Sequence, residues 1–134
     1  MKINKNRGLK RQLEACSLGD LVCVFWYDAS IGKSLGSGVA VDVPVKSWGV
    51  FIGIMGDKSK HIILAQNNFL YMDGIYDIDY TAVPLSWTSR ITVIVKNYIP
   101  SKEAGQLLNS FLVGGRRRQR KAQQRVKNHH EGLG

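Results

Sequence analysis

The stretch Leu21-Val-Cys-Val-Phe-Trp-Tyr27 decides the fold, because it is a continuous run of apolar, β-branched and aromatic residues. Such a run indicates a strand that is buried on both faces or curled into a barrel. A second stretch of this kind, from Trp48 to Met55, contains Gly49 and Gly53. Glycines inside a strand mark bends or a close approach of another backbone. Together the two stretches predict a strongly bent sheet.

The other predicted strands are short, and residues that favour turns separate them. We expect these strands at 39–43, closed by Pro44; at 61–66, after a polar turn at 56–59; at 80–83, closed by Pro84; and at 90–96. Loops are expected at 30–38, which is rich in glycine, and at 67–79. Four or five short strands with such connections are typical of a small β-barrel.

A short helix is predicted near each end of this β region. Leu9, Leu13 and Cys16 share one helical face, so residues 8–16 are expected to be helical after an extended arm at 1–7. The second helix is predicted at 102–113, with Ser101 as its N-cap and with a packing stripe of Leu107, Leu108, Phe111 and Leu112. The expected organisation is a basic arm and short helix at 1–17, a β-barrel domain at 18–98, a helix at 99–113 and a basic tail at 114–134.

Charge is distributed unevenly along the chain of 134 residues, which has a net charge of +9. Residues 1–14 carry five basic side chains and one acidic side chain, and residues 113–134 carry seven and one. The part between them is nearly neutral, with seven basic and eight acidic residues. A neutral body with two cationic ends favours a polyanionic partner, because Lys and Arg that bind phosphates release condensed counterions.

These two ends supply the predicted nucleic-acid contacts, and arginine predominates at 116–120, where its planar guanidinium suits bidentate binding of phosphate. The predicted contact residues are Lys2, Lys5, Arg7, Lys10, Arg11, Arg116, Arg117, Arg118, Arg120, Lys121, Arg125 and Lys127. A membrane is the weaker alternative, since residues 116–128 contain only two apolar residues. No apolar run is long enough for a membrane-spanning helix.

Two further patterns are compared with known ligand sites. Ser30-Ile-Gly-Lys-Ser34 is similar to part of a phosphate loop, but that motif needs glycine where this chain has Tyr27. Asp73, Asp77 and Asp79 could supply oxygen ligands to a divalent cation, although their spacing fits no calcium loop. Whether these aspartates bind a cation is left open by the sequence. Our prediction is that the protein has no metal site, no cofactor and no small-molecule substrate.

Two segments, Leu18-Gly-Asp-Leu-Val22 and Trp48-Gly-Val-Phe-Ile-Gly-Ile54, resemble strands of the NlpC/P60-type cysteine peptidases. The resemblance implies a catalytic histidine at the position of Trp48, and a nucleophile farther upstream than Cys16. Cys16 and His61 are the only nucleophile and base that could form a pair. A relative of these hydrolases without a working site is therefore one alternative, and we predict no catalytic residue.

The opening strand at Gly19–Phe25, the glycine-bearing strand and the closing strand at Ile91–Val95 together resemble the small SH3-like or Sm-like barrels of RNA-binding and ribosomal proteins, especially archaeal-type ones with basic extensions. The resemblance implies a non-catalytic module that docks on ribosomal RNA beside other ribosomal proteins. A DNA-binding chromosomal or viral protein is the alternative. Two cysteines without a second pair favour the reducing cytoplasm.

The aromatic residues divide into two groups. We expect most of those within or beside the apolar strands to lie in the core: Phe25, Trp26, Trp48, Phe51 and Trp87. Four tyrosines near polar loops remain open as residues that could stack on bases: Tyr27, Tyr71, Tyr76 and Tyr80.

Overall fold

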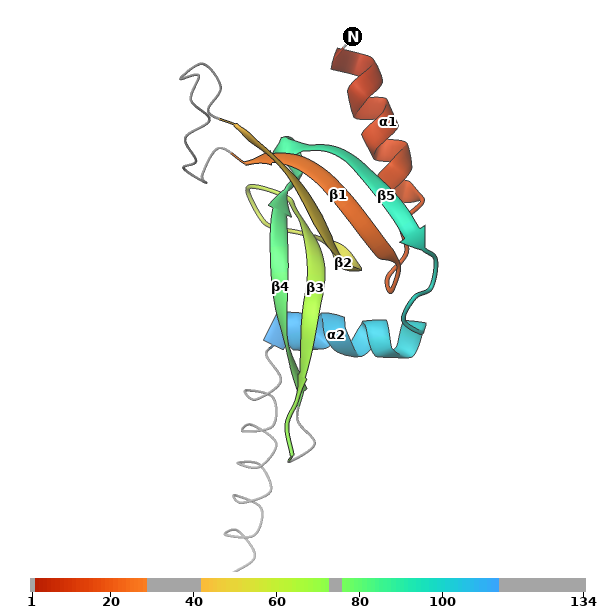
Figure 1. Cartoon of the computed structure of the whole chain (residues 1–134), viewed down its shortest axis with the longest axis vertical. Coiled ribbons are helices and arrows are strands. Elements are labelled where there is room, and N and C mark those ends of the chain that lie inside the picture. The colour runs from red at the N-terminus through yellow and green to blue at the C-terminus, as the bar shows by residue number, and fades with distance from the viewer. Residues whose placement is uncertain (1, 29–41, 73–75, 114–134) are drawn as a thin grey trace, which may run out of the picture.

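The computed structural model describes residues 2–28, 42–72 and 76–113, so the predicted loop at 30–38 and the basic tail at 114–134 lie outside it. The described chain is mainly β, with one five-stranded antiparallel sheet and two helices (Figure 1). In chain order the elements are α1 (Lys2–Glu14), β1 (Leu21–Asp28), β2 (Val43–Met55), β3 (His61–Leu70), β4 (Tyr76–Pro84), the 3₁₀ helix η1 (Leu85–Trp87), β5 (Thr88–Val95) and α2 (Ser101–Val113).

The strands are ordered β4-β3-β2-β1-β5, and β2 joins two differently oriented parts of the sheet (Figure 1). Its first part, up to Val50, pairs with β1, and its last part, from Val50 to Met55, pairs with β3. A Cβ atom on Gly49 would lie 2.9 Å from the Cβ of Leu64, so β3 approaches the β2 backbone closely there. The pairing register shifts between Phe51 and Gly53. The predicted bend is thus confirmed. The sheet is open within the described residues, so a closed barrel is not confirmed.

The central strands carry buried side chains on both faces over part of their length, and successive residues point to opposite faces. One face carries a core cluster of Val22, Val24, Phe51, Ile62, Leu64, Val83 and Ile91, and Leu9 and Leu13 of α1 pack against it. The other face carries Val50, Ile52, Ile63, Ala65 and Ile78, together with Leu107 of α2. The two helices therefore lie against opposite faces of the sheet, α1 mainly against β5 and α2 against β4 and β2, and each provides apolar side chains to its own cluster.

The N-terminal segment is helical from Lys2, so the extended arm expected at 1–7 is wrong. The apolar spacing begins only at Leu9, and the preceding turns of α1 have no apolar stripe that would mark them as helical. At the other end, α2 begins at Ser101, and the Pro100 carbonyl accepts a hydrogen bond from the Ala104 N–H at 2.9 Å. Ser101 therefore lies in the first turn and is not the cap.

The loop expected at 67–79 is also wrong, because β3 continues to Leu70 and β4 already begins at Tyr76. Asn67 and Asp79 are cross-strand partners in this hairpin. The Asp79 carboxylate accepts hydrogen bonds from the Asn67 backbone N–H at 2.6 Å and from the Asn67 side-chain amide at 2.9 Å. Polar residues that favour turns here form the exposed side of an extended hairpin.

The remaining strand limits differ more modestly from the prediction. Of the strand expected at 39–43, residues 39–41 lie outside the described part, and Pro44 does not close a strand, since β2 begins at Val43 and runs through Pro44. The last strand begins at Thr88 and not at residue 90. No helix in the described ranges is long and apolar enough to cross a membrane.

Candidate nucleic-acid interface

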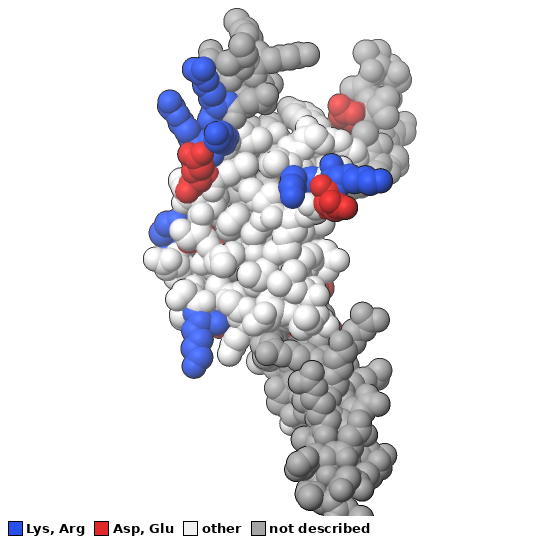
Figure 2. Space-filling model, turned by 180° about the vertical axis from the view of Figure 1, so that it is seen from behind, with Lys and Arg blue, Asp and Glu red and all other residues white. Residues whose placement is uncertain are grey.

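The structure places three of the predicted contact residues on one exposed helix surface. Arg7, Lys10 and Arg11 are exposed on α1, and basic side chains gather at this end of the molecule (Figure 2). Lys2 and Lys5 belong to α1, but their side chains lie outside the described part. The other predicted contacts, all in the tail, also lie outside it: Arg116, Arg117, Arg118, Arg120, Lys121, Arg125 and Lys127.

Helix α1 is held against the sheet by polar contacts as well as by its apolar stripe. The Gln12 side-chain carbonyl accepts a hydrogen bond from the Ile91 N–H of β5 at 2.9 Å. The Lys96 ammonium donates to the carbonyl of Ala15, just after the helix, at 2.7 Å. These contacts fix the direction in which the cationic side of α1 faces.

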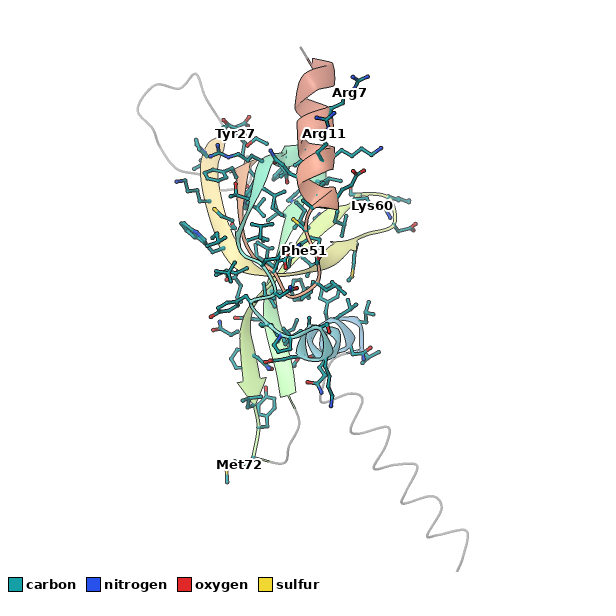
Figure 3. The ribbon with its side chains drawn as sticks, turned by 90° about the vertical axis from the view of Figure 1, so that its right-hand side faces the viewer. Arg7, Arg11, Tyr27, Phe51, Lys60 and Met72 are labelled. Atoms are coloured by element: carbon teal, nitrogen blue, oxygen red, sulfur yellow. The ribbon has the colours of Figure 1, made fainter. Side chains whose placement is uncertain are left out.

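A cleft between α1, the β2–β3 turn and η1 brings further lysines to this helix. It has a volume of about 530 Å³. We call it the lysine cleft; its lining residues are Leu9, Lys10, Leu13, Lys58, Ser59, Lys60, Leu85 and Ser86. Leucines supply its apolar lining, and three lysines come from two segments far apart in the chain. Figure 3 shows Arg7, Arg11 and Lys60 on the same side of the molecule.

The β2–β3 turn has a tightly defined backbone. Gly56 has a φ of +136°, and a Cβ there would lie 1.9 Å from the Ser59 carbonyl oxygen, so only glycine fits. The Lys60 ammonium donates a hydrogen bond to the Gly56 carbonyl at 2.7 Å. An ammonium group has three donors, so two remain for a ligand. Sequence reasoning missed Lys58 and Lys60, since two lysines in a turn carry no functional signal by themselves.

The lysines of the cleft form no ion pair within the described residues, although Glu14 and Asp57 lie near them in the sequence. The ion pair found there joins Lys96 to Asp20, and none involves Lys10, Lys58 or Lys60. Three ammonium groups around one cleft repel one another, and an anionic ligand would relieve this repulsion. The arrangement can therefore bind phosphate groups without any catalytic chemistry.

A second group of exposed side chains lies on the sheet, on the side of the molecule where Figure 3 labels Tyr27. We call it the aromatic sheet face and define it by Phe25, Tyr27, Lys46, Trp48 and Arg90, which come from β1, β2 and β5. The Lys46 Nζ lies 4.9 Å from the centroid of the Phe25 ring, and the Arg90 Cζ lies 3.9 Å from it. Four of the five residues also line a pocket of about 620 Å³.

The aromatic sheet face corrects the expectation that Trp48 and Phe25 belong to the core. Trp48 is 54% exposed, and Phe25 is only half-buried. Trp26 and Trp87 stack on each other with centroids 6.3 Å apart, and Trp87 is 38% exposed. Of the aromatic residues expected in the core, only Phe51 is fully part of it.

The four tyrosines near polar loops also differ from one another. Tyr27 is 49% exposed and belongs to the aromatic sheet face. Tyr80 makes an edge-to-face contact with Phe111 of α2, with centroids 4.7 Å apart, which gives it a structural role. Tyr71 is half-buried, and the Tyr76 side chain is not described.

The Gly-Asp pair that resembles the cysteine peptidases has a structural role here. Asp20 is fully buried and accepts hydrogen bonds from the Lys96 ammonium at 2.6 Å and from the backbone N–H groups of Ser17 and Asn97, each at 2.9 Å. Burial alone would raise the pKa of this carboxyl. The hydrogen bonds and the charge of Lys96 outweigh it and hold the pKa below its ordinary value of 3.8.

Cys16 has a poor environment for a nucleophile. Burial, followed by the nearby Asp20 carboxylate, raises the pKa of its thiol, and Lys96 opposes this only in part. The Cys16 thiol donates a hydrogen bond to the backbone carbonyl of Gln12 at 3.2 Å. His61 Nδ1 instead lies 3.1 Å from the Ser59 carbonyl, at the start of β3. A thiolate is therefore disfavoured at Cys16.

Two of the three aspartates considered for a cation form hydrogen bonds within the hairpin or to α2. Asp77 Oδ1 accepts hydrogen bonds from the Ile78 N–H at 2.8 Å and from the Ser110 hydroxyl at 3.3 Å. Asp79 is bound to Asn67, and Asp73 lies outside the described residues. Among the residues that the structure describes, no group of three His, Cys, Asp or Glu side chains is arranged to hold a metal.

Comparisons with known proteins found no significant match to this chain. No protein-family model matches the sequence, and no curated protein and no solved structure matches the chain significantly.

Proposed function

We propose that this chain is a non-catalytic RNA-binding protein, a ribosomal or ribosome-associated component that grips RNA phosphates with its basic segments. The lysine cleft is the observation that carries this proposal. It joins the predicted contact Lys10 to Lys58 and Lys60, which lie far away in the sequence, in one cationic site whose lysines form no ion pair among the described residues. A site of this kind suits the backbone of a folded nucleic acid, where several phosphates lie close together.

We also propose that the fold is of the small SH3-like or Sm-like barrel type. Strand β5 returns to pair with β1, and the two edge strands, β4 and β5, are connected only by the three residues of η1. This short connection keeps the two edges close together at one end of the sheet, which favours a strongly curled sheet. The predicted basic tail at 114–134 would extend the phosphate contacts beyond α2.

Binding of the full chain to a labelled RNA hairpin, followed by fluorescence anisotropy over a range of salt concentrations, tests the function. We expect Lys58→Ala to weaken binding and to lower the slope of log affinity against log salt concentration by about 0.9, the value for removing one phosphate contact on a duplex. Lys102→Ala is the matched control, since it removes one exposed lysine from α2, away from the cleft. Equal effects of the two variants would argue against the lysine cleft.

Two further measurements separate the alternatives. Sedimentation of the native protein with ribosomal particles, abolished at high salt or after RNase treatment, supports the ribosomal assignment. Release by DNase instead, or tighter binding to a DNA duplex than to RNA of the same sequence, favours the DNA-binding alternative.

A further inference from the structure

We infer that the aromatic sheet face, defined by Phe25, Tyr27, Lys46, Trp48 and Arg90, is a second binding site and takes unpaired bases of a single-stranded nucleic acid. This inference rests on the proposed function for its class of ligand. Its residues, however, are separate from the lysine cleft, so the two sites can be tested independently.

The strand register arranges these side chains in rows across the sheet. Tyr27 lies opposite Pro44, Phe25 lies between Lys46 and Arg90, and Cys23 lies between Trp48 and Thr92. Successive rows on one face of a sheet are about 7 Å apart, since they are two residues apart along each strand. Two exposed aromatic rings, Tyr27 and Trp48, therefore lie on either side of a row that holds two cations.

The central row holds its cations where a phosphate between two stacked bases could reach them. Lys46 and Arg90 both contact the Phe25 ring, which orients them without cancelling their charge. Neither forms an ion pair with an acidic side chain among the described residues. Phe25 is therefore a positioning residue for the two cations, and the outer rings are the stacking surfaces.

Trp48 is exposed because helix α2, which covers part of this face of the sheet, does not extend over it. Alternation places Trp48 on the same face of β2 as Val50 and Ile52, which are buried beneath Leu107 of α2. The backbone under Trp48 is held firmly, since the Gln66 side chain donates to the Trp48 carbonyl at 2.6 Å. A large aromatic side chain that is 54% exposed on a rigid strand gives a preformed surface for stacking.

The ligand class follows from the combination of rings and cations. Bases in a duplex are stacked on one another and offer no free face to Tyr27 or Trp48. An unpaired strand offers both a face to stack and a phosphate for Lys46 and Arg90. We therefore expect this site to distinguish single-stranded from duplex RNA, a distinction that the lysine cleft does not require.

The test uses the full chain with two fluorescein-labelled probes, an oligouridine of about 12 nucleotides and an RNA duplex of similar length. We expect Trp48→Ala and Tyr27→Ala each to weaken binding of oligouridine about tenfold, with duplex binding changed less than about twofold. Trp48→Phe should restore most of the affinity, because it keeps a ring. Tyr98→Ala is the control, since it removes a tyrosine that is 57% exposed outside the site.

The outcomes separate this inference from the proposed function. If Lys58→Ala weakens binding while Trp48→Ala and Tyr27→Ala leave oligouridine binding unchanged, the stacking site is wrong and the proposed function stands. Equal weakening of both probes by Trp48→Ala also overturns the inference, because it would reflect a loss of structure. If the unaltered chain binds neither probe, both proposals fail.

Discussion

At the scale of single residues, Asp20 is a fully buried carboxylate that forms the ion pair with Lys96. Its carboxylate, at the start of β1, ties together the end of the α1 segment and the end of β5 through Ser17, Lys96 and Asn97. A buried carboxylate requires such partners, because burial without them disfavours the charged form. The neighbouring Gly19 has a φ of +96°, and a Cβ there would lie 2.5 Å from the Ile99 carbonyl oxygen.

We predict that Asp20→Asn lowers the free energy of unfolding by about 2 kcal/mol, because it weakens the charge-assisted bond to Lys96 and leaves the amide with donors to satisfy. Urea denaturation at neutral pH measures this change. Asp57→Asn, in the exposed β2–β3 turn, is the control and should change stability by less than about 0.5 kcal/mol. A similar small change for Asp20→Asn would contradict the role assigned to this carboxylate.

Asp20 also predicts how stability depends on pH. Its pKa is lower in the folded protein than the ordinary value of 3.8, so the unfolded chain takes up the proton first as the pH falls. The stability that Asp20 contributes is complete above that ordinary value and disappears as the pH falls through the folded pKa. Denaturation midpoints measured from neutral to acidic pH should therefore fall less steeply for Asp20→Asn than for the unaltered chain; parallel curves would contradict this.

At the scale of elements, α2 depends on one buried stripe to cover the second face of the sheet. Ala104, Leu107 and Ser110 are its buried residues, whereas Leu112, predicted to belong to the packing stripe, is 60% exposed. Of the predicted stripe, Leu107 is buried and Leu108 and Phe111 are half-buried, whereas the prediction did not include Ala104 and Ser110. Only the packing decided how far along α2 the contact continues.

We predict that Leu107→Ala lowers the free energy of unfolding by about 3 kcal/mol, since it removes buried methyl groups from a cluster that includes Val50 and Ile52. Leu112→Ala changes the same residue type on the same helix and should cost less than about 0.5 kcal/mol. Thermal or urea denaturation of the two variants checks this. Equal losses of stability would show that α2 packs differently from the arrangement described.

At the scale of the whole molecule, the predicted basic tail follows the packed elements in the chain. The core residues that the structure describes all lie between Val22 and Leu107. The seven predicted contacts of the tail come after Val113 in the sequence. Binding and folding should therefore be separable in this chain.

We predict that ending the chain after Val113 leaves the unfolding midpoint nearly unchanged but weakens RNA binding strongly. The slope of log affinity against log salt concentration should fall by about 0.7 for every phosphate of a single strand that the tail no longer neutralises. Anisotropy titrations at several salt concentrations measure this slope. Unchanged affinity and slope would show that the tail makes no contact with RNA.

The sequence by itself determined the local features of this protein. The apolar run at Leu21–Tyr27 predicts the strand β1, the glycines at 49 and 53 predict the bend in β2, and the pattern at 102–113 predicts α2 to within one residue. The charged ends can also be read directly from the chain. These features depend on residues near one another in sequence, where periodicity and backbone preference act.

Only the tertiary structure decided which distant residues meet. The sheet order and the bend in β2 bring Lys58 and Lys60 to Lys10, and the limited reach of α2 leaves Trp48 exposed, although the apolar residues Val50, Phe51 and Ile52 follow it closely in the sequence. The long β3–β4 hairpin likewise depends on cross-strand bonds, such as that between Asn67 and Asp79, which overrule local turn preference. Contacts of this kind arise from pairing and packing across the whole fold, so local sequence patterns do not reveal them.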